Sequence, residues 1–381
     1  MDEVDSNFAG LKVAQSLNDT ASELKALVES DRSLIESSSS ELSGIVDRIY
    51  GVDSLSLREL VLGSDDDADD GSGDSDDDES DGNSEATPET VTRIVISLAA
   101  GRVMGRWASH VFTHEAPGLP DDLFHPLSRI SPVAGQPVAV CTEEEKPVVG
   151  NVGVLVDDPD NPHDLVTNIR TMIEQVWGNH ADAVEKEVCE VLGVKELRDY
   201  FRKPGKGGFW DDHISRYSKS RRKAPIYWLL QSSKKNYANW LYYHRLDKDL
   251  LFKALVNYVE PKIRMVESQL AMVRGQLQLT TGNGALTTDS KQRSKETKRL
   301  AKELESQEDF LSELRDFEDK LRRVANLNLE PDLNDGVILN IAPLWELVPW
   351  KEPKKYWDEL LAGKYEWSSI GKQLRERGVV K

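Results

Sequence analysis

The residues with the clearest chemical potential lie between positions 198 and 248. This segment holds thirteen Lys and Arg residues against four Asp residues, a net charge of +9 within a 381-residue chain whose net charge is −19. Eleven aromatic residues are interleaved with these cations. Cations neutralise phosphates and release counterions, while aromatic faces stack on bases. The composition therefore predicts a nucleic-acid-binding surface.

Two groups of residues in this segment are the predicted DNA contacts. The group expected to position phosphates is Arg216, Lys219, Arg221, Arg222 and Lys223. The group expected to lie near the DNA groove is Tyr227, His244 and Arg245. Other aromatic residues lie in apolar runs that are typical of strands, so we expect them in the core. These are Trp228, Trp240 and Tyr242.

The sequence gives weaker support to a metal site or a metal-dependent nuclease site. His110 and His114 have the spacing of two ligands on a helix face, with Glu115 and His125 nearby, but no HExxH motif is present. Asp121 and Glu144 resemble a metal-dependent nuclease pattern, although Pro147 favours a turn where that pattern needs a strand. We expect no metal site and no catalytic residue in this chain.

The remaining composition excludes several classes of protein. Only two cysteines occur, Cys141 and Cys189, which excludes a disulfide scaffold and a CxxC metal site. Neither a GxxxxGKS/T loop nor a GxGxxG loop is present, so a nucleotide cradle is not expected. The chain starts without a basic and apolar leader and has no apolar run of membrane-spanning length, so we expect a cytoplasmic protein without membrane contact.

An acidic insert accounts for most of the net charge. Residues 64–90 contain thirteen Asp and Glu residues and no Lys or Arg, so the rest of the chain has a net charge of −6. Such a segment cannot bury enough apolar surface to offset chain entropy, and it is predicted to be a disordered linker. Its alternative role is to mimic DNA phosphates and screen a basic groove.

Hydrophobic periodicity divides the chain into further parts. Residues 1–63 are predicted to be helical, residues 91–257 form an α+β region around the basic segment, and residues 328–381 are rich in Trp. Apolar residues in 258–327 repeat in steps of three and four on both sides of a Gly-rich loop, which predicts an antiparallel helical hairpin that protrudes. Its alternatives are a spacer and a dimerising coiled coil. The fold class is mainly α with small mixed β elements (α+β).

Several sequence blocks resemble a known family. They are residues 216–219 (RYSK), 224–228 (APIYW), 241–245 (LYYHR), 333–337 (LNDGV) and 340–344 (NIAPL), with weaker matches at 45–51 and 96–106. These blocks resemble the C-terminal part of the large adenine-specific DNA methyltransferases of phage-defence systems, the PglX-type enzymes of BREX and their DISARM relatives. The resemblance extends over residues 41–376 apart from the acidic insert.

The family's catalytic motifs are missing from this sequence. Such enzymes bind S-adenosylmethionine through an FxGxG-like loop and hold a flipped adenine with NPPY or NPPF, whereas Asn161-Pro162-His163 lacks the second proline and the aromatic residue. The resemblance therefore implies the recognition and scaffold part of a split or truncated methyltransferase, which binds double-stranded DNA. It would have no cofactor of its own, and S-adenosylmethionine would be bound by a separate catalytic chain. The alternative is a protein-interaction subunit that docks other defence-system proteins without touching DNA.

Overall fold

The computed structural model describes residues 11–12, 16–27, 29–30, 33, 87–106, 112–113, 153–219, 222–281 and 290–380. Most of the acidic insert and the tip of the predicted hairpin therefore lie outside the described residues. The chain divides into two compact units, Val13–Arg93 and a second one made of Met1–Lys12 and Ile94–Lys381. The five-part organisation expected from the sequence stays a prediction.

The smaller unit contains a helix over residues 17–27 and the first turns of α3 (Pro88–Val103). Leu17 and Ala21 are buried at a spacing of four, so one face of the first helix is apolar. The Ser16 hydroxyl accepts a hydrogen bond from the Asp19 backbone N–H at 3.0 Å, which satisfies one free donor at the start of that helix.

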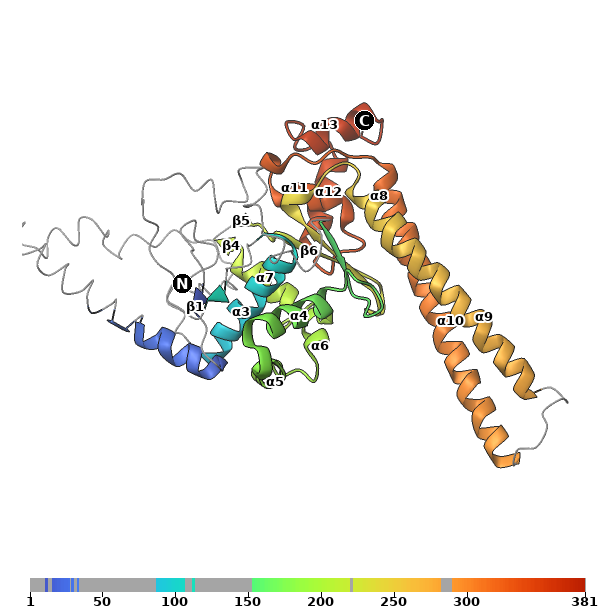
Figure 1. Cartoon of the computed structure of the whole chain (residues 1–381). Coiled ribbons are helices and arrows are strands. Elements are labelled where there is room, and N and C mark those ends of the chain that lie inside the picture. Colours follow the sequence, from blue (N-terminus) through green and yellow to red (C-terminus); the bar gives the residue numbers. More distant parts are fainter. Residues whose placement is uncertain are drawn as a thin grey trace, which may run out of the picture. The chain divides into compact units, whose positions relative to one another are not determined.

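The larger unit contains most of the regular structure (Figure 1). Its strands are β1 (Leu11–Lys12), β2 (Phe112–Thr113), β3 (Val154–Val156), β4 (Ser218–Lys219), β5 (Arg222–Lys223), β6 (Tyr227–Gln231) and β7 (Ala238–Tyr242). Its first helices are α4 (Leu165–Trp177), η4 (Gly178–His180), α5 (Ala181–Leu192), α6 (Leu197–Arg202), α7 (Phe209–Arg216), η5 (Tyr243–Arg245) and α8 (Leu250–Ala254). The later ones are η6 (Leu255–Val259), α9 (Glu260–Thr281), α10 (Ser290–Asn326), η7 (Leu333–Asp335), α11 (Val337–Ile341), η8 (Ala342–Leu344), α12 (Glu352–Leu361) and α13 (Ser369–Glu376).

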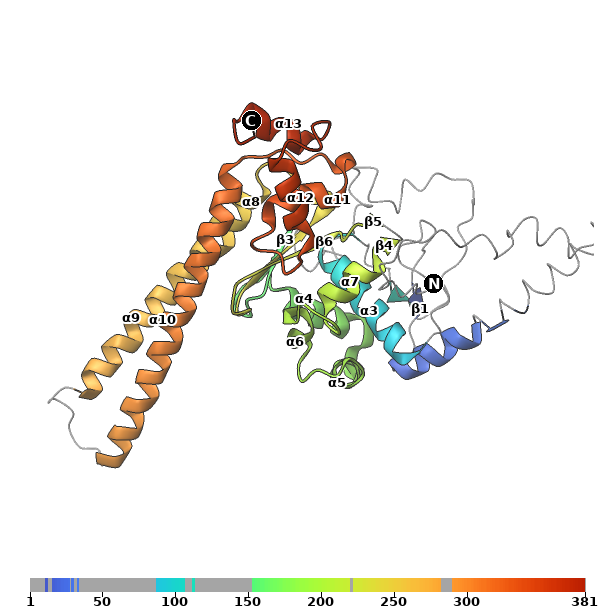
Figure 2. The same ribbon diagram turned by 180° about the vertical axis from the view of Figure 1, so that it is seen from behind.

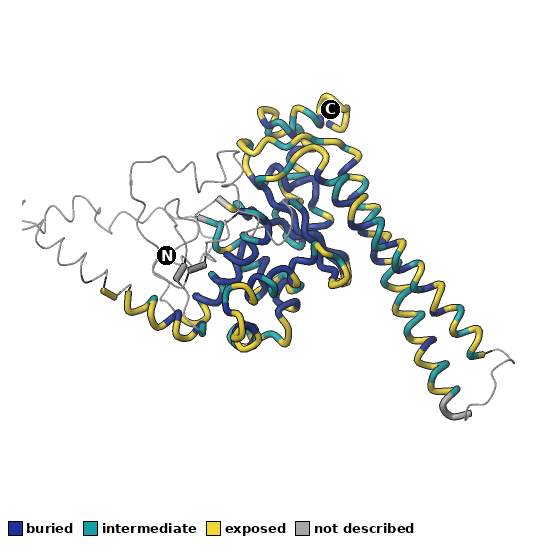
Figure 3. The backbone as a smooth tube through the Cα atoms, viewed as in Figure 1, coloured by how far each residue is buried: buried dark blue, intermediate teal, exposed yellow. Residues whose placement is uncertain are grey.

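A three-stranded antiparallel sheet in the order β3-β7-β6 forms the centre of this unit. All residues of the three strands are buried (Figure 3), so both faces of the sheet are covered. On one face the Trp240 ring contacts Phe201 of α6 and Phe209 of α7, with ring centroids 6.1 and 5.4 Å apart. On the other face Tyr237 contacts Phe317 of α10 at 5.6 Å. Because both faces are packed, the aromatic runs in these strands form a core.

The mainly α fold with small mixed β elements is confirmed, including the antiparallel hairpin. Helices α9 and α10 run side by side in both views (Figures 1 and 2). Their ion pairs follow in reverse sequence order: Arg322 with Glu260, Arg315 with Glu267, and Arg274 with Glu308. Apolar side chains predicted to line the seam are buried between them, including Val266 and Leu314. In the described part of the chain, no helix is both long and apolar enough to cross a membrane.

The C-terminal helices form an apolar cluster of their own. Its buried members are Leu339, Ala342, Leu360, Ile370, Leu374 and Val380. Three of the four tryptophans in this region, Trp345, Trp350 and Trp357, are partly buried. Trp367 is 62% exposed. The Trp-rich composition is therefore mostly a packing feature, with one aromatic ring left on the surface.

Glu313 of α10 joins the base of the hairpin to the β6–β7 turn. Its carboxylate is 4% exposed and accepts hydrogen bonds from the backbone N–H groups of Lys234 and Asn236 and from the Asn236 side-chain amide. We expect Glu313→Ala to lower the free energy of unfolding by about 1–3 kcal/mol, because it removes three hydrogen bonds to a charged acceptor that is itself buried. Urea unfolding measures this loss. Glu305→Ala, at an exposed position of the same helix, is the control, and an equal effect of the two variants would contradict the assignment.

Candidate nucleic-acid interface

The predicted phosphate contacts lie on and beside a short β ribbon that connects α7 to β6. Strands β4 and β5 pair antiparallel, with Ser218 opposite Lys223 and Lys219 opposite Arg222. The Ala224 N–H donates to the Tyr217 carbonyl at 3.1 Å and closes the ribbon at its base. Ribbons of two strands are one of the elements that fit the DNA major groove. The backbone therefore presents consecutive cationic positions on a narrow, closed element.

The individual side chains of this group are described to different extents. Arg216, at the last position of α7, is partly buried. Lys223 is exposed and forms an ion pair with Glu352 of α12. Arg221 and the side chains of Lys219 and Arg222 lie outside the described residues. The phosphate-contacting role of all five residues stays a prediction.

Helix η5 brings His244 and Arg245 to the same end of the sheet. The Tyr243 N–H donates to the Ile226 carbonyl at 2.8 Å, and Tyr227 pairs with Tyr242 at the end of the ladder. The ribbon therefore precedes the first residue of β6 at the same end of the sheet at which η5 follows the last residue of β7. Arg245 is exposed and His244 is partly buried. Burial, and then the charge of Arg106, lowers the pKa of His244, so its ring is neutral at physiological pH.

Tyr227 is a correction to the sequence prediction. Its side chain is fully buried, 4.7 Å from the His213 ring and 5.6 Å from the Tyr242 ring, measured between centroids. Both faces of β6 are covered, so this ring belongs to the core and does not reach a bound base. The core assignment of Trp228, Trp240 and Tyr242 is confirmed by exposed fractions of 1%, 1% and 2%.

His213, which belongs to no recognisable sequence motif, connects α7 to the start of β6. Its Nε2 accepts hydrogen bonds from the backbone N–H groups of Ile226 and Tyr227, each at 3.0 Å. An acceptor at Nε2 requires the neutral ring with its proton on Nδ1. Burial, and then the charges of Arg106 and Arg216, holds the pKa of His213 well below its ordinary value. One neutral, buried ring therefore joins α7, which precedes the ribbon, to the start of β6, which follows it.

Arg106 is a second residue that the composition of the basic segment could not reveal. Its guanidinium donates a hydrogen bond to the Tyr217 hydroxyl and lies 5.3 Å from the centre of that ring. This places the end of the α3 segment against the element that precedes the ribbon. The side chain is buried, so it supports Tyr217 and does not extend the surface.

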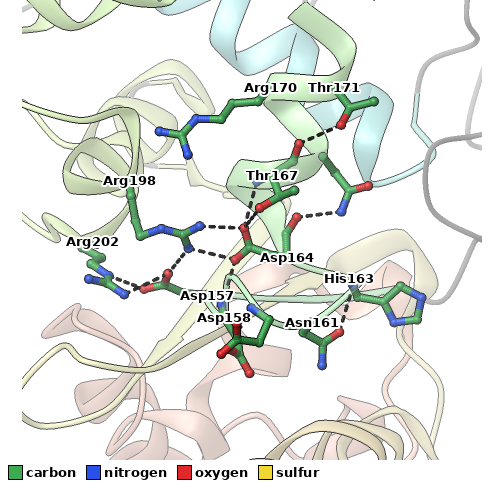
Figure 4. A network of polar contacts seen from close by, with 12 residues as sticks. Asp157, Asp158, Asn161, His163, Asp164, Thr167, Arg170, Thr171, Arg198 and Arg202 are labelled. Carbon is green, nitrogen blue, oxygen red and sulfur yellow. Dashed lines mark hydrogen bonds and ion pairs between the residues drawn. The ribbon is translucent and has the colours of Figure 1, made fainter. Parts of the chain in front are cut away.

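Two arginines of the basic segment are held in ion pairs with carboxylates of the loop that follows β3 (Figure 4). Arg198 bonds to both Asp157 and Asp164, and Arg202 bonds to Asp157 with Nε 2.5 Å from the carboxylate. Lys262 of α9 pairs with Asp158 at 2.7 Å. Three carboxylates thus meet three cations in the loop between β3 and α4. The net charge of the segment therefore overstates the charge that it offers to DNA.

Local hydrogen bonds explain why Asp164 stays charged although it is buried. Burial alone would raise the pKa of Asp164, but hydrogen bonds from Arg198 and Thr167 outweigh it and hold that pKa below its ordinary value. The Asp164 carboxylate also caps α4 through the Thr167 N–H at 2.8 Å. The Asn161 side-chain oxygen accepts the His163 N–H at 2.9 Å. Asn161 therefore stabilises a turn, in accord with its departure from the family's catalytic motif.

No arrangement suited to a metal was found among the described residues: no three His, Cys, Asp or Glu side chains converge there. The weaker candidates of the sequence, His110, His114, Glu115, His125, Asp121 and Glu144, lie outside the described residues. The expectation that this chain holds neither a metal nor S-adenosylmethionine stays a prediction.

Comparison with known proteins gives one informative similarity. No protein-family model matches the sequence. Over 122 aligned residues the chain is 30% identical to the adenine-specific methyltransferase BrxX of Escherichia coli O9:H4 (strain HS). The match covers 28% of this chain and 9% of that protein, so the chain spans only a small part of this relative. Part of the chain is therefore related in sequence to a BREX-type adenine-specific methyltransferase.

Proposed function

We propose that this protein is the DNA-recognition and scaffold portion of an adenine-specific DNA methyltransferase of a phage-defence system and acts with a separate catalytic chain. The observation that carries the proposal is the convergence of the cationic β4–β5 ribbon with η5 at one end of the central sheet. The sequence similarity to a BREX-type methyltransferase supports the same role. S-adenosylmethionine would be bound by the catalytic chain.

The chemistry of the ribbon fits contact with the DNA backbone. Arg and Lys side chains neutralise phosphates, and contacts of this kind set the register of a protein on a duplex without reading its sequence. The hydrogen bonds of His213 join α7 to the start of β6, and the Ala224 N–H closes the ribbon on the Tyr217 carbonyl, so the cationic positions lie on a preorganised element. Arg245 on η5 extends the same cationic end of the sheet.

A salt series with duplex DNA tests this proposal. The variant Lys219→Ala/Arg221→Ala/Arg222→Ala should weaken binding to all DNA sequences alike. The slope of log affinity against log salt should fall by about 0.9 for each lost phosphate contact, or about 2.7 in total. The control Lys25→Ala/Lys186→Ala/Lys195→Ala removes the same charge at exposed positions elsewhere. A salt slope equal to that of the control would contradict the ribbon assignment.

The second candidate function is a protein-interaction scaffold that does not touch DNA. Its support is Trp367, the most exposed aromatic side chain in the described C-terminal region at 62%, and Leu361 in the same region is also exposed. Exposed tryptophans are frequent anchors of protein interfaces. The same salt series separates the two functions, since absence of DNA binding by the unmodified protein at low salt would favour the scaffold.

A further inference from the structure

The two halves of the helical hairpin carry opposite net charges. The half next to the sheet, residues 260–267 and 303–326, holds six Lys and Arg residues against ten Asp and Glu residues, a net charge of −4. The outer half, residues 268–281 and 290–302, holds seven Lys and Arg residues and a single acid, Glu296, a net charge of +6. A hairpin that served only as a spacer would need no such separation.

Among the described residues, the ion pairs between the two helices use one outer cation, Arg274, which pairs with Glu308. The pairs of Arg322, Arg315 and Arg274 all use acids between positions 260 and 308. Helix α9 contains no acidic residue from position 268 to its end at Thr281. The outer part of α10 therefore faces a stretch of α9 without carboxylates, and among the described residues Lys295, Lys298 and Lys302 form no ion pair with that helix.

Three of these cations form an exposed stripe. Lys295, Lys298 and Lys302 are exposed, and in the described part of the chain none of them forms an ion pair or a side-chain hydrogen bond. Their spacing of three and four places them on one face of α10. The neighbouring Arg299 pairs with Glu296 and Glu303 of its own helix. The stripe thus offers three solvated ammonium groups over about 10 Å of helix.

We infer that this lysine stripe, Lys295, Lys298 and Lys302, binds the phosphate backbone of duplex DNA as a second contact beyond the ribbon. The inference deepens the proposed DNA-binding function and rests on it. Duplex DNA carries about one negative charge for every 1.7 Å of its axis, so several phosphates lie within the length of the stripe. Lysine suits this task because its ammonium group contacts phosphate as a point charge and needs no fixed geometry.

The length of α10 adds a requirement on the DNA. Lys302 lies 24 residues before the end of α10 at Asn326, which is about 36 Å along the helix. This distance matches the axial rise of about ten base pairs. The stripe should therefore contribute to binding of a long duplex and contribute little to binding of a short one.

The test compares the full chain with Lys295→Gln/Lys298→Gln/Lys302→Gln on duplexes of about 12 and about 40 base pairs. Each lost contact contributes up to about eightfold at 0.1 M salt, so affinity for the longer duplex should fall at least about tenfold and its salt slope by up to about 2.7. The matched control is Lys25→Gln/Lys186→Gln/Lys195→Gln. Circular dichroism checks that helix content is unchanged.

Each outcome decides between the two assignments. If the stripe variant and its control bind the long duplex equally well, the lysine stripe is not a DNA contact. The ribbon assignment then still stands, provided that the ribbon variant weakens binding. If the stripe variant loses binding and the ribbon variant does not, the stripe is confirmed as a DNA contact and the ribbon assignment is wrong. Equal loss on the short and long duplexes overturns the stripe as a distant contact. Absence of binding by the unmodified chain overturns both.

Discussion

Arg198→Met should lower the free energy of unfolding by about 3–5 kcal/mol, which is typical of removing one partner from a buried ion pair. The Arg198 side chain is 9% exposed and Asp164 is fully buried. Asp157 keeps Arg202 as a partner in the variant, whereas Asp164 keeps no cation, so the cost falls on Asp164. Urea unfolding followed by circular dichroism measures the change.

Arg170→Met is the matched control for this prediction. Arg170 pairs with Glu185, and the two side chains are 38% and 25% exposed, so its loss should cost no more than about 1 kcal/mol. Adding Asp164→Asn to Arg198→Met should restore part of the lost stability, because it removes the unpaired buried charge. Equal effects of the two arginine variants would show that the network of Figure 4 is not a buried charge cluster.

His213→Phe should lower the free energy of unfolding by about 2–4 kcal/mol, since the backbone N–H groups of Ile226 and Tyr227 lose their acceptor in a buried site. Phenylalanine retains a ring of similar shape against Tyr217 and Tyr227. Amide hydrogen exchange should also accelerate around residues 222–227. His180→Phe, at an exposed position, is the control, and an equal loss in both variants would contradict the role of Nε2.

The same histidine predicts how stability depends on pH. The unfolded state binds the proton with an ordinary pKa near 6.5, whereas the folded pKa of His213 lies well below that value because of burial and the charges of Arg106 and Arg216. Below about pH 6.5 the unfolded state therefore binds more protons, and stability falls as the pH decreases toward the folded pKa. The lowered pKa values of His163 and His244 act in the same direction.

Unfolding measured between pH 7 and pH 5 tests this dependence. His213→Phe removes the largest of the three histidine contributions, so its stability should vary less with pH than that of the unmodified protein. A profile with unchanged steepness would show that His213 has the same pKa in the folded and unfolded states, and would contradict its assignment as a neutral acceptor.

The parts of the fold that the sequence predicted correctly depend on local patterns. The apolar steps of three and four through Val266, Leu270 and Val273 describe one face of a helix, and the same holds for Leu314 and Leu321 on the partner. Because a Gly-rich loop joins the two helices, an antiparallel hairpin is the simplest arrangement that buries both apolar faces. The core positions of Trp228, Trp240 and Tyr242 followed for a similar reason, because the surrounding runs are apolar.

The candidate site was predicted only in part. The cationic positions of the ribbon were visible as a cluster in the sequence, whereas the burial of Tyr227 was not, since an aromatic residue in a basic segment fits a stacking surface equally well. The spacing of His213 four residues after Phe209 and three after Trp210 places it on their face of a helix, and this sequence signal could have identified the histidine as part of the core.

The sequence by itself determined the helical hairpin, the mainly α composition and the cationic segment, because periodicity and charge are properties of neighbouring residues. Only the tertiary structure decided which cations remain available. Arg198 and Arg202 meet Asp157, which lies about forty residues earlier in the chain, and His213 accepts hydrogen bonds from a strand that begins after the ribbon. Such pairings form when distant segments pack together, since burial removes the water that would otherwise solvate each charge and each N–H group.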